Sequence, residues 1–132
     1  MAMRKSVSIA WAIILAHLAV NYFHGAAHVT LGIGLADWER EFVAIVILLA
    51  PLLAGVMLLS RLRRTGGWLL AASMAAACLF GIYKHFIGAG PDNALTMVSG
   101  VSSLQFQITA VLLAVIEALG CWAGIRVADE EG

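Results

Sequence analysis

The chain has little charge, few prolines and few cysteines for its length. Of its 132 residues, only 12% are Asp, Glu, Lys or Arg, and it contains two prolines and two cysteines. Because a soluble domain has about a quarter of its residues charged, this shortage excludes an ordinary soluble fold. The cysteines form no Cys-x-x-Cys pair, which weighs against thiol-redox chemistry of that kind. The formal net charge of zero argues against nucleic acid as a partner.

Apolar residues fill most of the sequence instead. Hydrophobic residues make up 62% of the chain, and its mean hydropathy is +0.95. Crossing a hydrocarbon core of about 30 Å takes about 20 helical residues. Four apolar stretches are that long, at residues 6–34, 42–60, 68–88 and 101–125. We therefore predict an all-α integral membrane protein, with one four-helix transmembrane domain over residues 1–132, in the lipid bilayer of a bacterial inner (plasma) membrane.

Short connections join these stretches, at residues 35–41, 61–67 and 89–100, so consecutive helices are expected to be antiparallel neighbours. Basic residues gather before the first stretch and in the second connection, whereas acidic residues gather in the other two. By the positive-inside tendency, both termini are predicted to be cytoplasmic. The apolar start runs well beyond the roughly 7 to 15 residues of a signal-peptide core, so we expect it to remain as the first helix.

Three of the four histidines fall on one face of the first predicted helix. At about 100° per residue, an arc of about 60° holds four polar residues: His17, Asn21, His24 and His28. A polar side chain at membrane depth is costly and is expected to face the protein interior. His24 and His28 are four residues apart, the spacing at which two imidazoles on one helix can converge on one metal ion.

The fourth histidine, His85, is expected at the same level as His24. At about 1.5 Å per residue, His85 lies about 27 Å and His24 about 28 Å from the cytoplasmic side. We therefore predict a metal site near the outer interface, with an acid of the first connection as an alternative fourth ligand. The predicted metal ligands are His24, His28, His85 and Asp92, and the residues predicted around the cofactor are Asn21, Tyr83 and Lys84.

Several cofactors are compatible with this ligand set. Imidazoles suit zinc, copper, iron and nickel, and the lack of well-placed thiolates disfavours a soft-metal site. A haem b with two histidine axial ligands, His85 and either His24 or His28, is an alternative that needs an open slot between the first and third helices. Interhelical hydrogen bonding without any metal is a further alternative. The choice stays open at the level of sequence.

Glu117 is the only acidic residue deep inside a predicted span. It is expected about 13 Å and His17 about 18 Å from the inner face, so the two meet if the first and fourth helices are adjacent. We predict that they form a catalytic pair that handles protons, or additional metal ligands. The alternative is a neutral Glu117 carboxyl bonded to a polar residue at the start of the fourth helix: Ser102, Ser103, Gln105, Gln107 or Thr109.

Three further features predict local structure. Pro51 leaves a backbone carbonyl near Ile47 without its helical donor and should kink the second helix. Gly120 and Gly124 suit close packing of the fourth helix, either within the chain or across a homodimer. The acidic residues 128–132 are expected to be disordered.

Three classes of function follow from this pattern. The main prediction is a membrane redox component (an oxidoreductase) or metalloenzyme, with a metal or haem in the outer half and a quinol or small lipophilic substrate. The second is a small metal or proton-coupled transporter, in which the histidines and Glu117 are stations along a path. The third is a metal-free accessory or assembly subunit of a larger membrane complex. Whether the protein is an enzyme stays open.

Overall fold

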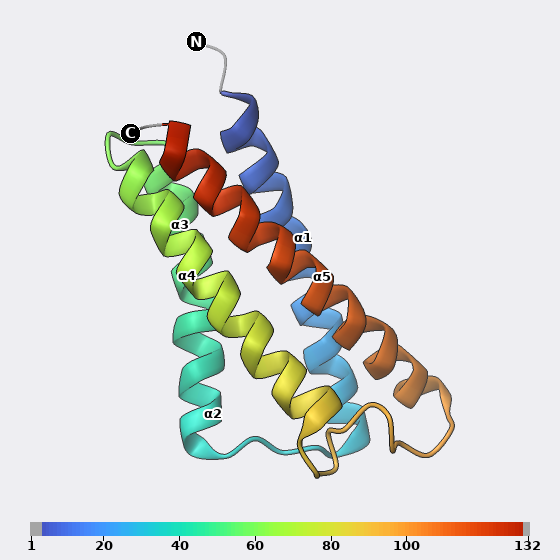
Figure 1. Ribbon diagram of the computed structural model, residues 1–132. Helices are drawn as coiled ribbons and strands as arrows, with labels where there is room; N and C mark the ends of the chain where they lie inside the picture. The colour runs from blue at the N-terminus through green and yellow to red at the C-terminus, as the bar shows by residue number, and fades with distance from the viewer. Residues whose placement is uncertain (1–3, 131–132) are drawn as a thin grey trace.

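The computed structural model describes residues 4–130. It is an antiparallel bundle of long helical spans (Figure 1). The first span is helix α1 (Lys5–Leu31); the second is α2 (Asp37–Phe42), the π-helix η1 (Val43–Leu49) and α3 (Ala50–Leu58); the third is α4 (Arg63–Ile82) and the π-helix η2 (Tyr83–Ile87); the fourth is α5 (Val101–Glu130). Within residues 4–130, four spans are long and apolar enough to cross a membrane. The predicted all-helical class with four apolar spans is confirmed.

The spans end at other residues than the sequence suggests, for local reasons. α1 stops at Leu31 because Gly32 adopts a left-handed backbone with φ of 66°, and the Ile33 N–H turns back to the His28 carbonyl at 3.0 Å. The second span begins at Asp37 because the Glu39 carboxylate accepts a hydrogen bond from the Ala36 N–H at 2.8 Å. Acidic side chains in this first turn also favour a helix start.

The other two spans also extend beyond the expected ranges. The third begins at Arg63 rather than at residue 68, and the fourth continues to Glu130 rather than ending at residue 125. Val127 and Ala128 are buried in the bundle. The expectation of a disordered tail is therefore wrong for residues 128–130, and residues 131–132 lie outside the described part of the chain.

Both described chain ends lie at one end of the bundle, together with the turn between α3 and α4 (Figure 1). We call this the terminal half; its assignment to the cytoplasm stays a prediction. Nine buried apolar residues from all four spans fill it, and we call them the apolar core: Val7, Ala10, Ile14, Ala54, Leu58, Leu70, Met74, Ala123 and Val127. Gly124 packs so closely on α4 that a Cβ there would lie 2.5 Å from the Gly67 carbonyl oxygen. The glycines of α5 therefore serve packing within the chain.

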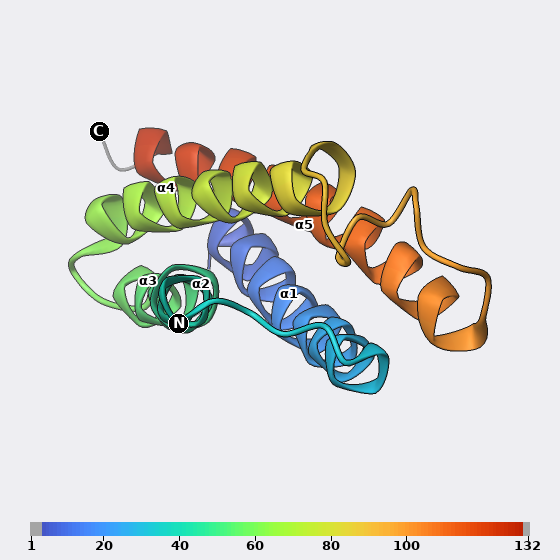
Figure 2. The same cartoon turned by 90° about the horizontal axis from the view of Figure 1, so that it is seen from below.

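The helices are arranged differently at the opposite end, which we call the cavity half. The start of α2 lies apart from the end of α1, and residues 32–36 bridge the two (Figures 1 and 2). α1 packs along α5, while η1 packs along α4. The wider turns of η1 come directly before Pro51, while the kink expected at this proline stays a prediction. Both π-helices lie in this half, and such segments are frequent at functional sites.

Candidate metal centre

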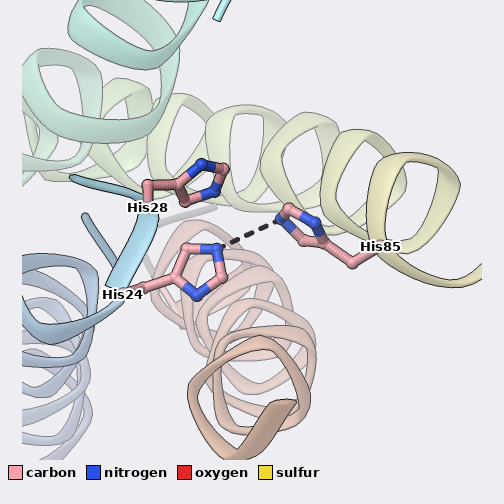
Figure 3. Close-up of side chains that lie close together, drawn as sticks. All are labelled: His24, His28 and His85. Carbon is pink, nitrogen blue, oxygen red and sulfur yellow. Dashed lines mark hydrogen bonds between the residues drawn. The ribbon is translucent and has the colours of Figure 1, made fainter. Parts of the chain in front are cut away.

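The three histidines of the cavity half point toward one another (Figure 3). His24 and His28 extend from α1, one helical turn apart, and His85 extends from η2. One ring nitrogen from each histidine lies within 4.8 Å of those from the other two. The Nε2 atoms of His24 and His85 are 3.2 Å apart. His24 and His85 are buried and His28 is half-buried, so the predicted convergence of the three rings is confirmed.

Backbone carbonyls fix the protonation of two of these rings. The Nδ1 atom of His85 lies 3.0 Å from the Asp92 carbonyl oxygen, and that of His28 lies 3.3 Å from the Ile33 carbonyl oxygen. Because a carbonyl oxygen only accepts hydrogen bonds, Nδ1 is the donor in both pairs. We therefore assign the proton to Nδ1 and leave the Nε2 lone pair free in both rings.

The third ring follows the same pattern through a side chain of α5. The Nδ1 atom of His24 lies 2.9 Å from the Thr109 hydroxyl oxygen. We assign the one proton of that hydroxyl to a carbonyl within its own helix, that of Gln105, at 2.8 Å. The Thr109 oxygen is then the acceptor, and His24 also carries its proton on Nδ1.

On these assignments, the Nε2 atoms of His24 and His85, which are 3.2 Å apart, are two acceptors that face each other. Two acceptors repel at this distance, and a cation bound by both relieves the repulsion. Nitrogen atoms that bind one zinc ion at about 2.0–2.1 Å in tetrahedral geometry lie about 3.3 Å apart. The separation observed between His24 and His85 therefore matches that of two ligands of one ion.

Phe106 of α5 holds the three rings from one side. It is fully buried, and its ring centroid lies 4.6 Å from that of His24, 4.9 Å from that of His28 and 5.0 Å from that of His85.

Two axial ligands of a haem must lie on opposite sides of the iron, about 4 Å apart at a metal–nitrogen distance of about 2 Å. The 3.2 Å separation is shorter, so the geometry gives the haem hypothesis no support.

An ion-pair cluster lies next to the histidines. The Lys84 ammonium, on η2, lies 2.8 Å from the Glu39 carboxylate of α2 and 3.2 Å from the Asp92 carboxylate. Both acids are buried. The structure thus brings Asp92 to the site, but its carboxylate contacts Lys84 and its carbonyl contacts His85; its role as a ligand stays a prediction. Tyr83, predicted beside the cofactor, is 59% exposed and does not line the cavity described below.

Sequence reasoning identified some of these contacts only in part. From the sequence, Glu39 is only one of three acidic residues in the first connection. Its position three residues after Ala36, at the start of a helix, is the signal that distinguishes it from the other two acids. Thr109 is among the residues predicted to bond Glu117, whereas in the structure its hydroxyl contacts His24. The two glutamines reach backbone carbonyls instead, Gln105 that of Phe23 at 2.8 Å and Gln107 that of Ala94 at 2.7 Å.

The predicted contact between His17 and Glu117 is confirmed. The His17 Nε2 atom of α1 lies 3.2 Å from Glu117 Oε1 of α5, and both side chains are buried. Asn21 donates a hydrogen bond to the His17 carbonyl oxygen at 3.0 Å, within α1. The observed partner of Glu117 is thus a histidine rather than a polar residue from the start of α5.

A cavity of about 430 Å³ extends from the three histidines to Glu117 of this pair. Such a volume is typical of small-molecule sites. Residues of α1, η1, α4, η2 and α5 line it, with His24, His28, His85, Lys84 and Asp92 toward one end and Glu117 toward the other. Most of the remaining lining is apolar: Leu18, Ile47, Leu48, Ala77, Phe80, Ala110, Leu113 and Ala114. Both π-helices therefore contribute to the walls of one cavity.

Comparison with known proteins adds no ligand or activity to this picture. No protein-family model, curated protein or solved structure matches the chain. We therefore infer its function from the geometry, burial and chemistry of the three histidines, the cavity and the His17–Glu117 pair.

Proposed function

We propose that the protein is a membrane metalloprotein that binds one transition-metal ion through the Nε2 atoms of His24, His28 and His85. One observation carries this proposal: the Nδ1 atom of each ring contacts an oxygen, so that a proton assigned to Nδ1 leaves the three Nε2 atoms for a metal. Metal-binding histidines almost always donate their other ring N–H to a carbonyl, carboxylate or water. Here two carbonyls and one hydroxyl serve that purpose.

Zinc is an ion that suits the ligand type and the shortest spacing in this site. Neighbouring nitrogens around a square-planar ion at about 2.0 Å lie about 2.8 Å apart, and those around a tetrahedral ion lie about 3.3 Å apart. The 3.2 Å between His24 and His85 is near the tetrahedral value, and the three ligand nitrogens lie within 4.8 Å of one another, so the rings must close further around a bound ion. Copper or iron in the same ligand set would make the protein a redox component instead. The identity of the metal therefore decides between a metalloenzyme and a redox component, the two forms of the main prediction.

A site with three protein ligands keeps one coordination position free, and we infer that this position faces the cavity. Structural zinc sites fill all four positions with protein ligands, whereas catalytic sites keep one for water or substrate. An ion bound here supplies a Lewis acid or an activated water. Since the cavity walls are mainly apolar, the arrangement favours a metalloenzyme that acts on a small lipophilic substrate.

Transport of a metal ion or proton is a second candidate function. The cavity continues from the histidines to Glu117, which gives it polar groups at two levels. Beyond the His17–Glu117 pair, however, the four spans meet in the apolar core. A path across the bundle ends there in this conformation, and transport therefore requires a second conformation that opens the terminal half.

Elemental analysis of the purified protein tests the metal proposal. After loading with zinc and dialysis, we expect one zinc ion per chain, and a near-complete loss in His24→Ala and His85→Ala. Tyr83→Phe is the matched control, because Tyr83 lies two residues from His85 with an exposed side chain; it should keep its zinc. A wild-type chain that binds no metal would favour a metal-free accessory subunit, whereas histidine variants with unchanged stoichiometry would place the ion elsewhere in the chain.

A further inference from the structure

The end of the cavity nearest the apolar core holds a carboxylate, that of Glu117, which does not contact the three metal-site histidines. Glu117 binds His17 through Oε1, at 3.2 Å from Nε2. Its other oxygen, Oε2, is turned toward Gly81 of α4, where a Cβ atom would lie 3.9 Å from it. Gly81 and Glu117 both line the cavity. One oxygen of the carboxyl group is therefore held by the protein, and the other faces the cavity.

The orientation of His17 indicates where its proton resides. The side chain is fully buried, and within residues 4–130 its Nδ1 atom has no hydrogen-bond partner. A buried N–H group without an acceptor is rarer than an unsatisfied acceptor, so we assign the proton to Nε2, which donates it to Glu117 Oε1. No acceptor stands at Nδ1 to take a proton further. His17 is thus a positioning residue at the end of the path rather than an intermediate along it.

The pair has few titratable neighbours. From α4, the Cys78 thiol lies nearby and donates to the Ala114 carbonyl oxygen at 3.5 Å; on α5 itself, Cys121 follows one turn later. η1 presents only apolar side chains to the cavity, Val43, Ile47 and Leu48. Within the described part of the chain, His17 is the one titratable group hydrogen-bonded to Glu117, and the Cys78 thiol interacts with it electrostatically. Protonation of Glu117 therefore changes the charge at this end of the cavity, with His17 as its directly bonded partner.

The two sides of the pair differ in access. Toward the histidines lies the cavity, whose rim includes the exposed Arg40. Toward the chain ends lies the apolar core, in which all nine residues are at most 2% exposed. Water and protons can follow polar groups along the cavity, whereas the nine side chains of the apolar core carry no hydrogen-bonding group.

We propose that Glu117 is a proton-binding site that exchanges protons with only one side of the membrane, the side at which the cavity half ends. A hydronium ion in the cavity transfers a proton to Oε2: one of its O–H bonds breaks, a new O–H bond forms on Oε2, and a water molecule is left. The carboxylate becomes a neutral acid, while the His17 N–H keeps its hydrogen bond to Oε1. The site does not depend on a metal bound at the three histidines, so it can hold whether or not the metal proposal does.

Labelling with dicyclohexylcarbodiimide tests this proposal on the wild-type chain. This lipophilic reagent adds a protonated carboxylic acid across a C=N bond and leaves ionised carboxylates unmodified. The protein is reconstituted in liposomes in which a tag at the C-terminus is accessible from outside, so that the cavity half faces the lumen. Lumenal and external pH are set separately, and the adduct on Glu117 is followed by mass spectrometry.

We expect the labelling of Glu117 to fall about tenfold for each unit by which the lumenal pH rises, once most of the acid is ionised. The labelling should not change with the external pH. A response to external pH, or to both, would overturn the one-sided access. Absent or pH-independent labelling would overturn the exchangeable proton itself. Glu117→Gln should remove the adduct. His17→Ala should change the pH of half-maximal labelling, whereas Asn21→Ala, which removes a contact only to the His17 backbone, should not.

Discussion

In the terminal half of the bundle the helices approach until their backbones nearly touch, whereas in the cavity half they separate around polar side chains. A Cβ atom on Gly124 would lie 2.6 Å from the Ala71 backbone nitrogen, and one on Gly66 would lie 3.0 Å from the Ala54 carbonyl oxygen. The cavity half instead places three imidazoles, an ion-pair cluster and two π-helices around one cavity. Glycines allow the close helix contacts of the terminal half, and paired polar residues surround the cavity of the cavity half.

The comparison shows how the protein tolerates polar groups at membrane depth. Such groups are costly unless they find partners. In the cavity half, each metal-site histidine bonds an oxygen through Nδ1, and Lys84 bonds two carboxylates. In the terminal half, close packing provides the van der Waals contacts that hold membrane helices together. We infer that the terminal half stabilises the bundle, while the cavity half carries the chemistry.

The largest expected effect comes from breaking the terminal half. Gly124→Leu places a side chain where the α4 backbone already lies, so α4 and α5 must separate; we expect a loss of about 3 kcal/mol in the free energy of unfolding, at the upper end for overpacking. Gly25→Ala is the matched control, because a Cβ there meets nothing within 4 Å. Unfolding in mixed micelles measures both. Equal losses in the two variants would refute the division of roles between the halves.

A smaller effect, confined to the cavity half, should follow from removing the acceptor behind His24. Thr109→Val deletes the hydroxyl that bonds Nδ1 while nearly keeping the side-chain shape. Loss of such an outer contact typically weakens metal binding about 10- to 100-fold. Thr109→Ser keeps the hydroxyl and should bind zinc nearly as the wild type does. Competition with a chromophoric chelator measures both affinities, and identical values for the two variants would contradict the assigned hydrogen bond.

The smallest effect should come from the ion-pair cluster. Lys84→Met leaves the Glu39 and Asp92 carboxylates without their cation. Because Lys84 is partly exposed, we expect no more than about 1 kcal/mol of lost stability and a zinc affinity changed only a few-fold. Asp37→Asn, which removes the exposed pair with Arg40, should change neither quantity. A loss of zinc in Lys84→Met as complete as in His85→Ala would mean that the cluster, rather than the imidazoles, holds the ion.

Much of this arrangement follows from periodicity and length. Apolar runs locate the four spans, a 3.6-residue period places His24 and His28 on one face, and a fixed rise per residue brings His85 to their level. The orientation of each ring does not follow. It depends on carbonyl oxygens that the turn at Gly32 and the connection 88–100 bring to His28 and His85. A choice between haem and a single ion requires those orientations.

Sequence patterns also do not predict the π-helices or the burial of Glu39. Pro51 predicts an irregular helix, but not that the wider turns extend over Val43–Leu49. Likewise, three acids in the first connection look alike until the start of α2 buries Glu39 beside Lys84. Both features depend on tertiary packing rather than on local preference.

X-ray absorption at the zinc edge of the loaded wild-type protein tests the metal centre most directly. We predict four light-atom ligands at about 2.0–2.1 Å, with outer-shell scattering from three imidazoles and no sulfur near 2.3 Å. That result would place His24, His28 and His85 around one ion with its fourth position open to the cavity. A spectrum with sulfur ligands, with fewer than three imidazoles, or of zinc surrounded only by water would contradict the proposed trihistidine site.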